Sequence, residues 1–272
     1  MFELKGNIHV LKKFYNQEQI GFVFDSILEG NTPSEVYVDS VEAPNISLIW
    51  DKGHCFYFGG VTADEDAYSE GIEFFIDKFL NESTKQIIKI AKIYFISDIW
   101  ESKLLELLQR FKPIIAPRSL YCHDLGSIPF VTTKIDNVEV RSINEELIQN
   151  ESLNNIECMV EEITSMWGSP QRFLNKGFGC YALEGQNIAC WCTAEYVSST
   201  SCGIGIETIG EYQTKGIASA TAAGFLNKCM QLKVTPYWDS WKRNTPSIKV
   251  AEKLGFKNVK DYRIILLQLI ED

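Results

Sequence analysis

Histidine is scarce in this sequence, with three residues in 272, at positions 9, 54 and 123. They lie far apart along the chain, so we expect neither a histidine-based catalytic triad nor a zinc site. The sequence also lacks the run of about 18 apolar residues that a membrane-spanning helix needs. Its first residues, MFELKGNIHVLKKF, contain no apolar core of a signal peptide. We therefore expect a cytoplasmic protein with no membrane partner.

Positive charge is in deficit. The chain has 26 Lys and Arg against 36 Asp and Glu, a net charge of −10. A general nucleic-acid-binding protein would need a basic face, so we expect no nucleic acid partner. The deficit is uneven, because residues 201–272 have ten basic and seven acidic residues, a net charge of +3, which leaves −13 on residues 1–200. A polyanionic ligand suits the basic segment best.

The cysteines favour a structural interpretation. There are eight, at positions 55, 122, 158, 180, 190, 192, 202 and 229. Without an export signal we expect reduced thiols. Cys190 and Cys192 alternate along an apolar run, so both side chains share one face of a strand. Such a pair can bind a metal or act in redox chemistry, but the apolar surroundings favour two small core residues, and we predict no metal site.

The chain divides into two halves. The stretch HDLGSIPFVTTKIDNVEV at 123–140 contains a Gly-Ser-Ile-Pro turn, which predicts domains at 1–128 and 129–272. Both halves alternate between strand-like and helix-like segments, which predicts an α/β (α+β) class. In the first half the expected strands are 35–41, 46–50, 54–60, 92–97 and 119–125, and the helices 65–80 and 99–110. In the second half the expected helices are 143–165 (with a break), 170–175, 215–231 and 245–254, and the strands 178–185, 187–197, 201–208, 235–241 and 262–269.

Residues 205–220, GIETIGEYQTKGIASA, lead from a predicted strand through a glycine-containing turn into a predicted helix. This order favours anion binding, because the first helical turn has free N–H groups and a positive dipole end. The P-loop pattern fails, since Lys215 comes before Gly216 and not after it. The dinucleotide pattern fails, since its first two glycines would lie inside the strand. We interpret Gly205 and Gly210 as glycines that mark the strand and the turn, respectively, and not as ligand-binding residues.

A third pattern fits. Residues Gln213 to Ala218, QTKGIA, match (Q/R)xxGx(G/A), and WKRNTPSIKVAEKLGFK follows at 241–257. In this the chain resembles the GNAT superfamily of acyl-CoA-dependent N-acyltransferases over about 139–272. The resemblance implies a mixed, mostly antiparallel sheet flanked by helices. Over its whole length the chain resembles the bacterial zwittermicin A resistance type, whose N-terminal half looks like a degenerate GNAT fold. The features that suggest this resemblance are HCFYFGG, KIYFIS and the run from IACWCTAEYV to the motif.

The resemblance implies acetyl-CoA as the acyl donor. The backbone amides of the pattern would hold the pyrophosphate, and the strand before it would pair with the pantetheine arm and polarise the thioester carbonyl. The residues implied in cofactor binding are Ile206, Thr208, Gln213, Thr214, Lys215, Gly216, Ile217, Ala218, Asn244 and Ser247. For two of them a structural role is an open alternative: Lys215 as a solvated loop residue and Asn244 as a turn residue before the capped helix.

The implied reaction is direct attack of an amine on the thioester, which needs a base to remove a proton. We predict Glu207 as this base and Glu195 as the second candidate; either carboxylate is equally explained as a surface or substrate-binding group. Family members often have a tyrosine seven residues after the Asn, where this sequence has Ala251. The leaving thiolate then departs unaided, or another group such as Ser247 or Tyr237 protonates it, or catalysis is lost.

Two functions follow from the resemblance. The first is a small-molecule N-acetyltransferase that acts on an amine-bearing metabolite or antibiotic. The second is a non-catalytic acyl-CoA-binding regulatory or interaction module, which Ala251 favours slightly. The residues do not name the acceptor, and they leave a monomer and a homodimer equally open.

Overall fold

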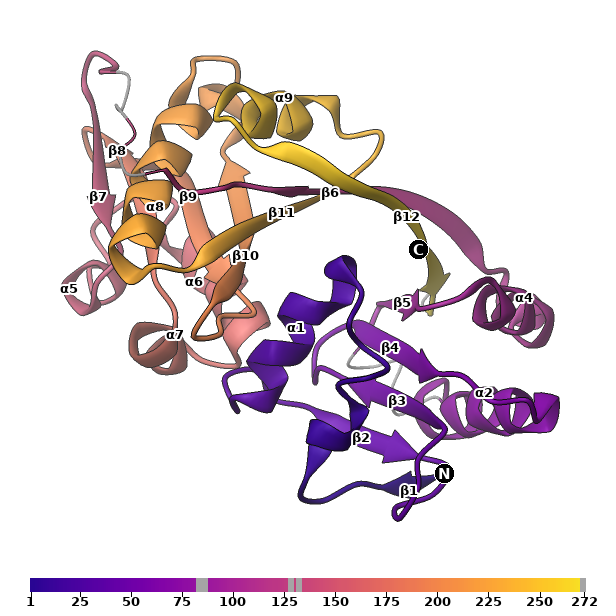
Figure 1. The fold of residues 1–272 in the computed structure, drawn as a ribbon. Helices are drawn as coiled ribbons and strands as arrows, with labels where there is room; N and C mark the ends of the chain where they lie inside the picture. The colour runs from indigo at the N-terminus through magenta and orange to yellow at the C-terminus, as the bar shows by residue number, and fades with distance from the viewer. Residues whose placement is uncertain (82–87, 127–129, 131–133, 270–272) are drawn as a thin grey trace. The chain divides into compact units, whose positions relative to one another are not determined.

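The computed structural model describes residues 1–81, 88–126, 130 and 134–269. The chain forms two compact units, of which unit 1 is Met1–Arg118 with Asp261–Asp272 and unit 2 is Ser119–Lys260 (Figure 1). Each unit is of the α/β class, with a mostly antiparallel sheet flanked by helices, which confirms the predicted fold class. The predicted boundary at residue 128 lies outside the described residues, so the limits 1–128 and 129–272 stay a prediction.

The strands of unit 1 follow the order β1, β2, β3, β4, β5, β12. Their bounds are Phe2–Glu3, Glu35–Val38, Ile46–Trp50, Cys55–Gly60, Ile90–Phe95 and, for β12, Lys257–Gln268. Strands β4 and β5 run parallel, whereas the other neighbours pair antiparallel. Parallel neighbours need a crossover connection, and helix α2 (Glu65–Phe79) supplies it.

The two faces of the unit 1 sheet are covered differently. Phe56 and Phe58 pack against Phe75 of α2, and Phe58 also packs against Trp100 of α4 (Asp98–Leu107). Tyr15 covers the opposite face, where its hydroxyl lies 2.8 Å from Ser47 Oγ. The remaining helical segments of the unit are α1 (Glu18–Leu28), η1 (Ile8–Leu11) and η2 (Gln109–Phe111).

Helix α1 is absent from the sequence-based expectations. Its sequence, EQIGFVFDSIL, is rich in aromatic and β-branched residues of modest helix propensity. Polar Gln19 and Ser26 are buried in it together with the apolar residues, so the helical period of polarity is blurred. Tertiary packing therefore decides the conformation: Phe24 packs against Tyr15, whose hydroxyl bonds to Ser47 and Tyr57 of the sheet.

The strands of unit 2 follow the order β6, β11, β10, β9, β8, β7. Their bounds are Ile114–Cys122, Thr235–Trp241, Ser201–Thr208, Asn187–Glu195, Gly179–Glu184 and Val138–Ser142. Strands β10 and β11 run parallel, and helix α8 (Ile217–Leu232) connects them. Strand β6 begins in unit 1 and ends in unit 2, while β12 does the reverse.

Helices cover both faces of the unit 2 sheet. Helix α8 lies along β7, β8 and β9, where Phe225 stacks on Phe178 (Figure 1). Helix α6 (Ile156–Trp167) packs on β9, and Trp167 Nε1 donates to the carbonyl of Ala194. The other helical segments are α5 (Glu145–Ile148), α7 (Pro170–Lys176), η3 (Gly210–Tyr212) and α9 (Thr245–Lys253). Strand β9, which lies between α8 and α6, is therefore buried on both faces.

The ends of several elements differ from the expectation. Strand β6 starts at residue 114 and not 119, since Pro117 is a turn signal inside its first half. Strand β12 starts at 257 and not 262, since its exposed first half is polar. The predicted helix 143–165 is two helices, and α6 begins after Asn155 in the left-handed region (φ 66°). Gly255, which follows the predicted helix 245–254, has φ +90°, the left-handed conformation that commonly ends a helix.

Among the helices that the structure describes, none combines the length and the apolar character that crossing a membrane requires.

Unit 1 has a partly buried histidine that makes its stability depend on pH. The neutral His54 ring accepts from Lys92 Nζ at 2.8 Å, and burial, together with the charge of Lys92, lowers the pKa of His54 from 6.5 to about 4. The unfolded chain therefore binds a proton in a range where the folded chain does not. We expect the free energy of unfolding to fall by about 1–2 kcal/mol between pH 7 and pH 5 from this residue.

Urea unfolding at both pH values measures the effect. His54→Gln keeps an acceptor for Lys92 but does not titrate, so it should lose less stability on acidification than the wild type. His9→Gln removes an exposed histidine and should behave like the wild type. An equal pH dependence in wild type and His54→Gln would contradict the assignment.

Candidate active site

Strands β10 and β11 part within unit 2. They pair over three positions, Ser201 with Thr235, Cys202 with Pro236 and Gly203 with Tyr237. Residues 204–208 of β10 continue to pair with β9 but have no ladder partner on β11 in the described part of the chain. One edge of β10 is therefore open over five residues.

The register shows which main-chain groups point to this open edge. Ile209 N–H donates to the carbonyl of Ala189 at 3.0 Å, so the groups of residue 209 point toward β9. Successive residues of a strand point their N–H and C=O groups in opposite directions. The N–H groups of Ile206 and Thr208 therefore point away from β9, into the gap that β11 has left. Both were predicted from the sequence as the residues that pair with the pantetheine arm.

The loop after β10 ends in an open helix start. Thr214 and Gly216 are in the left-handed region, with φ of 62° and 83°, and Gly216 is the residue before α8. Within the described residues, the N–H groups of residues 214–219 have no hydrogen-bond acceptor. The start of α8 also has no acidic residue in its first turn. These amides and the positive end of the helix dipole suit an anion.

The three polar side chains of the pattern, those of Gln213, Thr214 and Lys215, lie on the protein surface. Gln213 Nε2 donates to the carbonyl of Thr208 at 3.1 Å, which ties the loop to the end of β10. Lys215 Nζ lies 5.1 Å from the centre of the Tyr212 ring. The structure thus gives Gln213 a role in shaping the loop, and the groups that remain available to an anion are main-chain amides.

Glu195 and Glu207 lie on one face of the sheet. Gly203 pairs with Glu195 and Glu207 pairs with Trp191, and these positions are separated by even steps along each strand. Thr208 belongs to the opposite face, where its Oγ1 donates to Cys190 Sγ at 3.3 Å. The structure therefore brings the two carboxylates predicted as candidate bases to the same face, beside the open edge of β10.

Gly205 helps to position Glu195. Its interpretation from the sequence, as a glycine that only marks the strand, missed this role. A Cβ at this position would lie 2.4 Å from Glu195 Oε1 and 3.2 Å from Thr193 Oγ1. The carboxylate of Glu195 thus occupies the space that any other residue at 205 would fill. A side chain at position 205 would displace this carboxylate, so the glycine sets where the Glu195 carboxylate lies.

Sequence reasoning missed a third carboxylate, that of Glu162 on α6. Its Oε2 accepts a hydrogen bond from Trp191 Nε1 at 2.8 Å. Burial raises the pKa of Glu162, and the charge of Glu207 adds to this effect, while the Trp191 bond opposes it. An amphipathic helix pattern marks only which residues face the core, so no local signal could have identified Glu162.

Helix α9 provides the other predicted cofactor residues. Asn244 Oδ1 accepts from Ser247 N at 3.3 Å, so Asn244 caps the helix. Ser247 Oγ accepts from Trp238 Nε1 at 3.0 Å. Ala251, at the position where a tyrosine was looked for, is fully buried in the core. The contacts of Asn244 and Ser247 are thus internal to unit 2.

The cysteine pair is buried. Cys190 and Cys192 are both free thiols with no exposed surface, and burial raises the pKa of Cys190 to about 11. A thiol with a raised pKa is a poor nucleophile and a poor metal ligand. In the described residues no group of His, Cys, Asp and Glu has the arrangement of a metal site.

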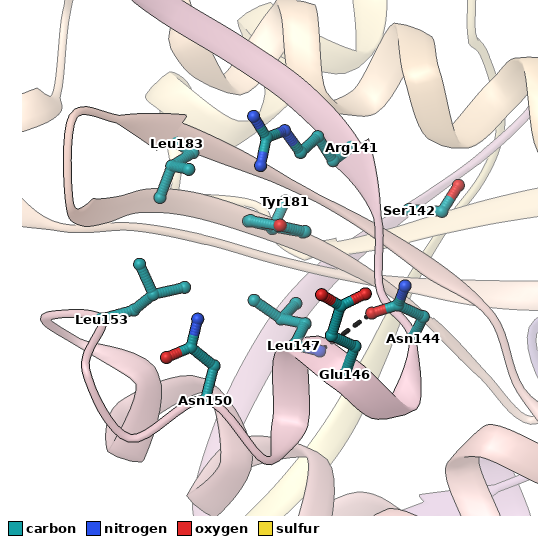
Figure 2. Close-up of a pocket in the computed structure, with 9 residues that line it drawn as sticks. All are labelled: Arg141, Ser142, Asn144, Glu146, Leu147, Asn150, Leu153, Tyr181 and Leu183. Atoms are coloured by element: carbon teal, nitrogen blue, oxygen red, sulfur yellow. Dashed lines mark hydrogen bonds between the residues drawn. The ribbon is translucent and has the colours of Figure 1, made fainter.

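A separate pocket of about 390 Å³ lies between α5 and strands β7 and β8 (Figure 2). Arg141 and Tyr181, which are paired across these strands, line one side of it, and Asn144 lines the other. Arg141 is bonded to Glu139, and Asn144 Oδ1 accepts from Leu147 N. Arg141 and Asn144 are thus engaged within the protein.

This arrangement, a parallel strand pair that parts beside an open helix start, agrees with the family match. The model of the GNAT acetyltransferase family matches residues 12–265, so the chain belongs to this family. The match is not limited to residues 129–272 and includes most of unit 1.

Three relatives extend over nearly the whole chain. The uncharacterized N-acetyltransferase YdfB of Bacillus subtilis (strain 168) is 26% identical over 260 residues, 93% of each chain. A GCN5-related N-acetyltransferase-like protein from Streptococcus suis has a TM-score of 0.70 at 18% identity, and covers 94% of this chain and 96% of its own. A Drosophila protein has a TM-score of 0.64 at 12% identity, with 98% and 97% covered. The two structures support the fold.

Proposed function

We propose that the protein is an acetyl-CoA-dependent N-acetyltransferase that transfers an acetyl group to the amine of a small molecule. The observation that carries this proposal is the open edge of β10 next to the unsatisfied amides at the start of α8. A row of main-chain hydrogen-bond donors lies next to an anion site. These two features match the two parts of acetyl-CoA: the pantetheine arm, which contains amides, and the diphosphate. Family membership makes this the leading activity.

The residues present fit the donor. The N–H groups of residues 214–219 would hold the diphosphate, and the main chain of Ile206 and Thr208 would pair with the pantetheine arm. An N–H on this edge also stabilises the oxyanion that forms on the thioester carbonyl. Lys215 adds positive charge near the diphosphate. Asn244 and Ser247 contribute by holding the start of α9 in shape.

The reaction requires two proton transfers. Glu207 takes the proton from the ammonium form of the acceptor, directly or through water, and the amine nitrogen then attacks the thioester carbonyl carbon. A C–N bond forms and the C–S bond breaks. Glu195, held beside Gly205, lies on the same face and binds the acceptor or replaces Glu207 as base.

As the tetrahedral intermediate collapses, the amine nitrogen loses its second proton and the leaving thiolate gains one, so a group between them can pass its own proton to the thiolate and take the one from nitrogen. Of the two groups considered in place of Ala251, Ser247 is engaged with Trp238, on the core side of β11. Tyr237 pairs with Gly203, where β10 and β11 part, and its neighbour Trp238 faces the core. Tyr237 therefore lies on the carboxylate face at the mouth of the gap, and we assign it this role.

Unit 1 repeats the order of elements in unit 2 but has lost the donor site. Strand β4 pairs with β5 from Cys55 to Phe58, so only its last two residues lack a partner on β5. The start of α2 is capped by Asp64 and followed by Glu65 and Asp66, which repel an anion. We interpret unit 1 as a degenerate GNAT fold that binds no acyl-CoA, and expect one acetyl-CoA per chain.

We also propose that the chain is a cytoplasmic, bacterial protein of the zwittermicin A resistance type, and that its acceptor is an amine-bearing metabolite or antibiotic. The second candidate is a non-catalytic acyl-CoA-binding module. Buried Ala251 favours it, because no tyrosine hydroxyl is available at that position of α9.

A thiol-release assay with acetyl-CoA and a panel of amines separates the two candidates. We expect turnover with at least one small amine. Acetyl-CoA binding at micromolar concentration without turnover of any amine would favour the module. No thermal stabilisation by millimolar acetyl-CoA would refute both.

Gly216→Asp should weaken acetyl-CoA binding by about tenfold or more, because it puts a negative charge at the diphosphate. Gly216→Ala is the matched control, since it imposes the same strain at φ +83° without the charge. Isothermal titration calorimetry measures both affinities, and it also counts the sites per chain. Equal affinities of the two variants would contradict the diphosphate assignment.

Glu207→Gln should lower turnover about 100-fold at pH 7 while acetyl-CoA binding is kept. The loss should shrink as pH rises, because the free amine then no longer needs a base. The pH profile of kcat/KM measures this. Glu211→Gln, at an exposed position of η3, removes the same charge nearby and should retain activity. A wild-type profile in Glu207→Gln would exclude it as the base.

A further inference from the structure

The pocket between α5 and strands β7 and β8 has charged groups of opposite sign on two of its sides (Figure 2). Arg141 lies on the strand side and Glu146 on the helix side, with the Tyr181 ring between them. Both charged side chains are exposed, so a ligand can reach them from solvent. The volume of about 390 Å³ is within the range of small-molecule sites.

Both charged groups keep hydrogen-bonding capacity for a ligand. Arg141 donates to Glu139 through Nε and Nη2, and the Tyr181 hydroxyl is the other group that interacts with its guanidinium. A guanidinium has five N–H donors, so Arg141 has donors left over. Among the described residues, the carboxylate of Glu146 has no hydrogen-bond or ion-pair partner. The pocket therefore offers one cationic and one anionic group.

Two side-chain amides and three leucines complete the lining. Asn144 and Asn150 each accept a local hydrogen bond through Oδ1, and in the described part of the chain their NH2 groups donate to no protein atom. Leu147 is buried, and Leu153 and Leu183 are partly buried and pack against the core of unit 2. An apolar wall thus stands beside the charged and amide groups.

We propose that this pocket binds a free α-amino acid with an apolar side chain. The carboxylate of the ligand pairs with Arg141 and accepts from the two amide NH2 groups, and its ammonium group pairs with Glu146. Its side chain packs on the leucines and loses contact with water. A ligand with a carboxylate alone, or with an ammonium group alone, leaves one of the two charged groups without a partner. The site does not depend on the proposed function.

The pocket is separate from the proposed base. Arg141, Tyr181, Trp191 and Glu207 are direct partners across four neighbouring strands, so they lie along one line of the sheet. Neighbouring strands are about 4.8 Å apart, which puts the main chains of Arg141 and Glu207 about 14 Å apart. Trp191, which is 2% exposed, fills the sheet face between them. An amino acid in the pocket is therefore a second ligand and not the acceptor of the acetyl group.

Isothermal titration calorimetry of the full chain with L-leucine tests the proposal, and we expect binding at one site per chain. Two analogues each lack one charge: 4-methylpentanoate has no amino group, and 3-methylbutylamine has no carboxylate. Each should bind about tenfold more weakly than L-leucine, because one charged group of the pocket stays unpaired. Neither heat nor thermal stabilisation with about 10 mM L-leucine would overturn the proposal. Equal affinity for L-leucine and either analogue would overturn it as well.

Two variants locate the site. Arg141→Gln removes the partner of the carboxylate and Glu146→Gln that of the ammonium group, and each should weaken L-leucine binding about tenfold. Both should keep the acetyl-CoA affinity and the thermal unfolding of the wild type, which separates loss of the site from loss of the fold. Glu145→Gln, at the adjacent exposed position of α5, is the matched control and should bind L-leucine like the wild type.

Wild-type affinity for L-leucine in both Arg141→Gln and Glu146→Gln would show that the amino acid binds elsewhere and would overturn the assignment. The proposed function is tested separately. Failure of the wild type to bind acetyl-CoA would refute that function, and the L-leucine titration would still decide whether the pocket is a site.

Discussion

The hydrogen bonds that β10 does not make to β11 are the constraint on which the site depends. Main-chain polar groups inside a sheet must find partners, and β10 loses one set of partners after Gly203. The strand stays extended because its other edge is paired with β9 as far as Thr208. The Gln213 side chain then ties the following loop to the Thr208 carbonyl. A row of main-chain groups is thus held in place and offered to a ligand.

Small structural differences separate unit 2, which has the proposed donor site, from unit 1, which does not. In each, two neighbouring strands run parallel and a helix crosses over between them. In unit 1 the strands stay paired nearly to their ends, and Asp64 caps the crossover helix. In unit 2 the strands part, and Gly216 leaves the helix start open. The two units therefore differ in two features: the length over which the parallel strands pair, and the charge of the first turn of the crossover helix.

The carboxylate face gives the site its second property. Glu207 is exposed on β10, Glu195 lies over Gly205, and Glu162 reaches the same face from α6 through Trp191. Buried or clustered carboxylates favour protons and cations as partners. In the proposed reaction, main-chain amides bind the donor and carboxylates bind the acceptor, so the two substrates meet groups of opposite charge.

The sequence by itself determined the features that act over a few residues. It indicated the α/β alternation, the helix end at Gly255, and the run from Gln213 to Ala218, because glycine placement and side-chain periodicity limit local backbone angles. Tertiary structure alone decided the rest. Helix α1 needs the sheet beneath it, the meaning of Gly205 depends on Glu195 ten residues earlier, and Glu162 meets Trp191 across 29 positions. Contacts between distant segments depend on strand register and packing, and no short stretch of sequence contains either.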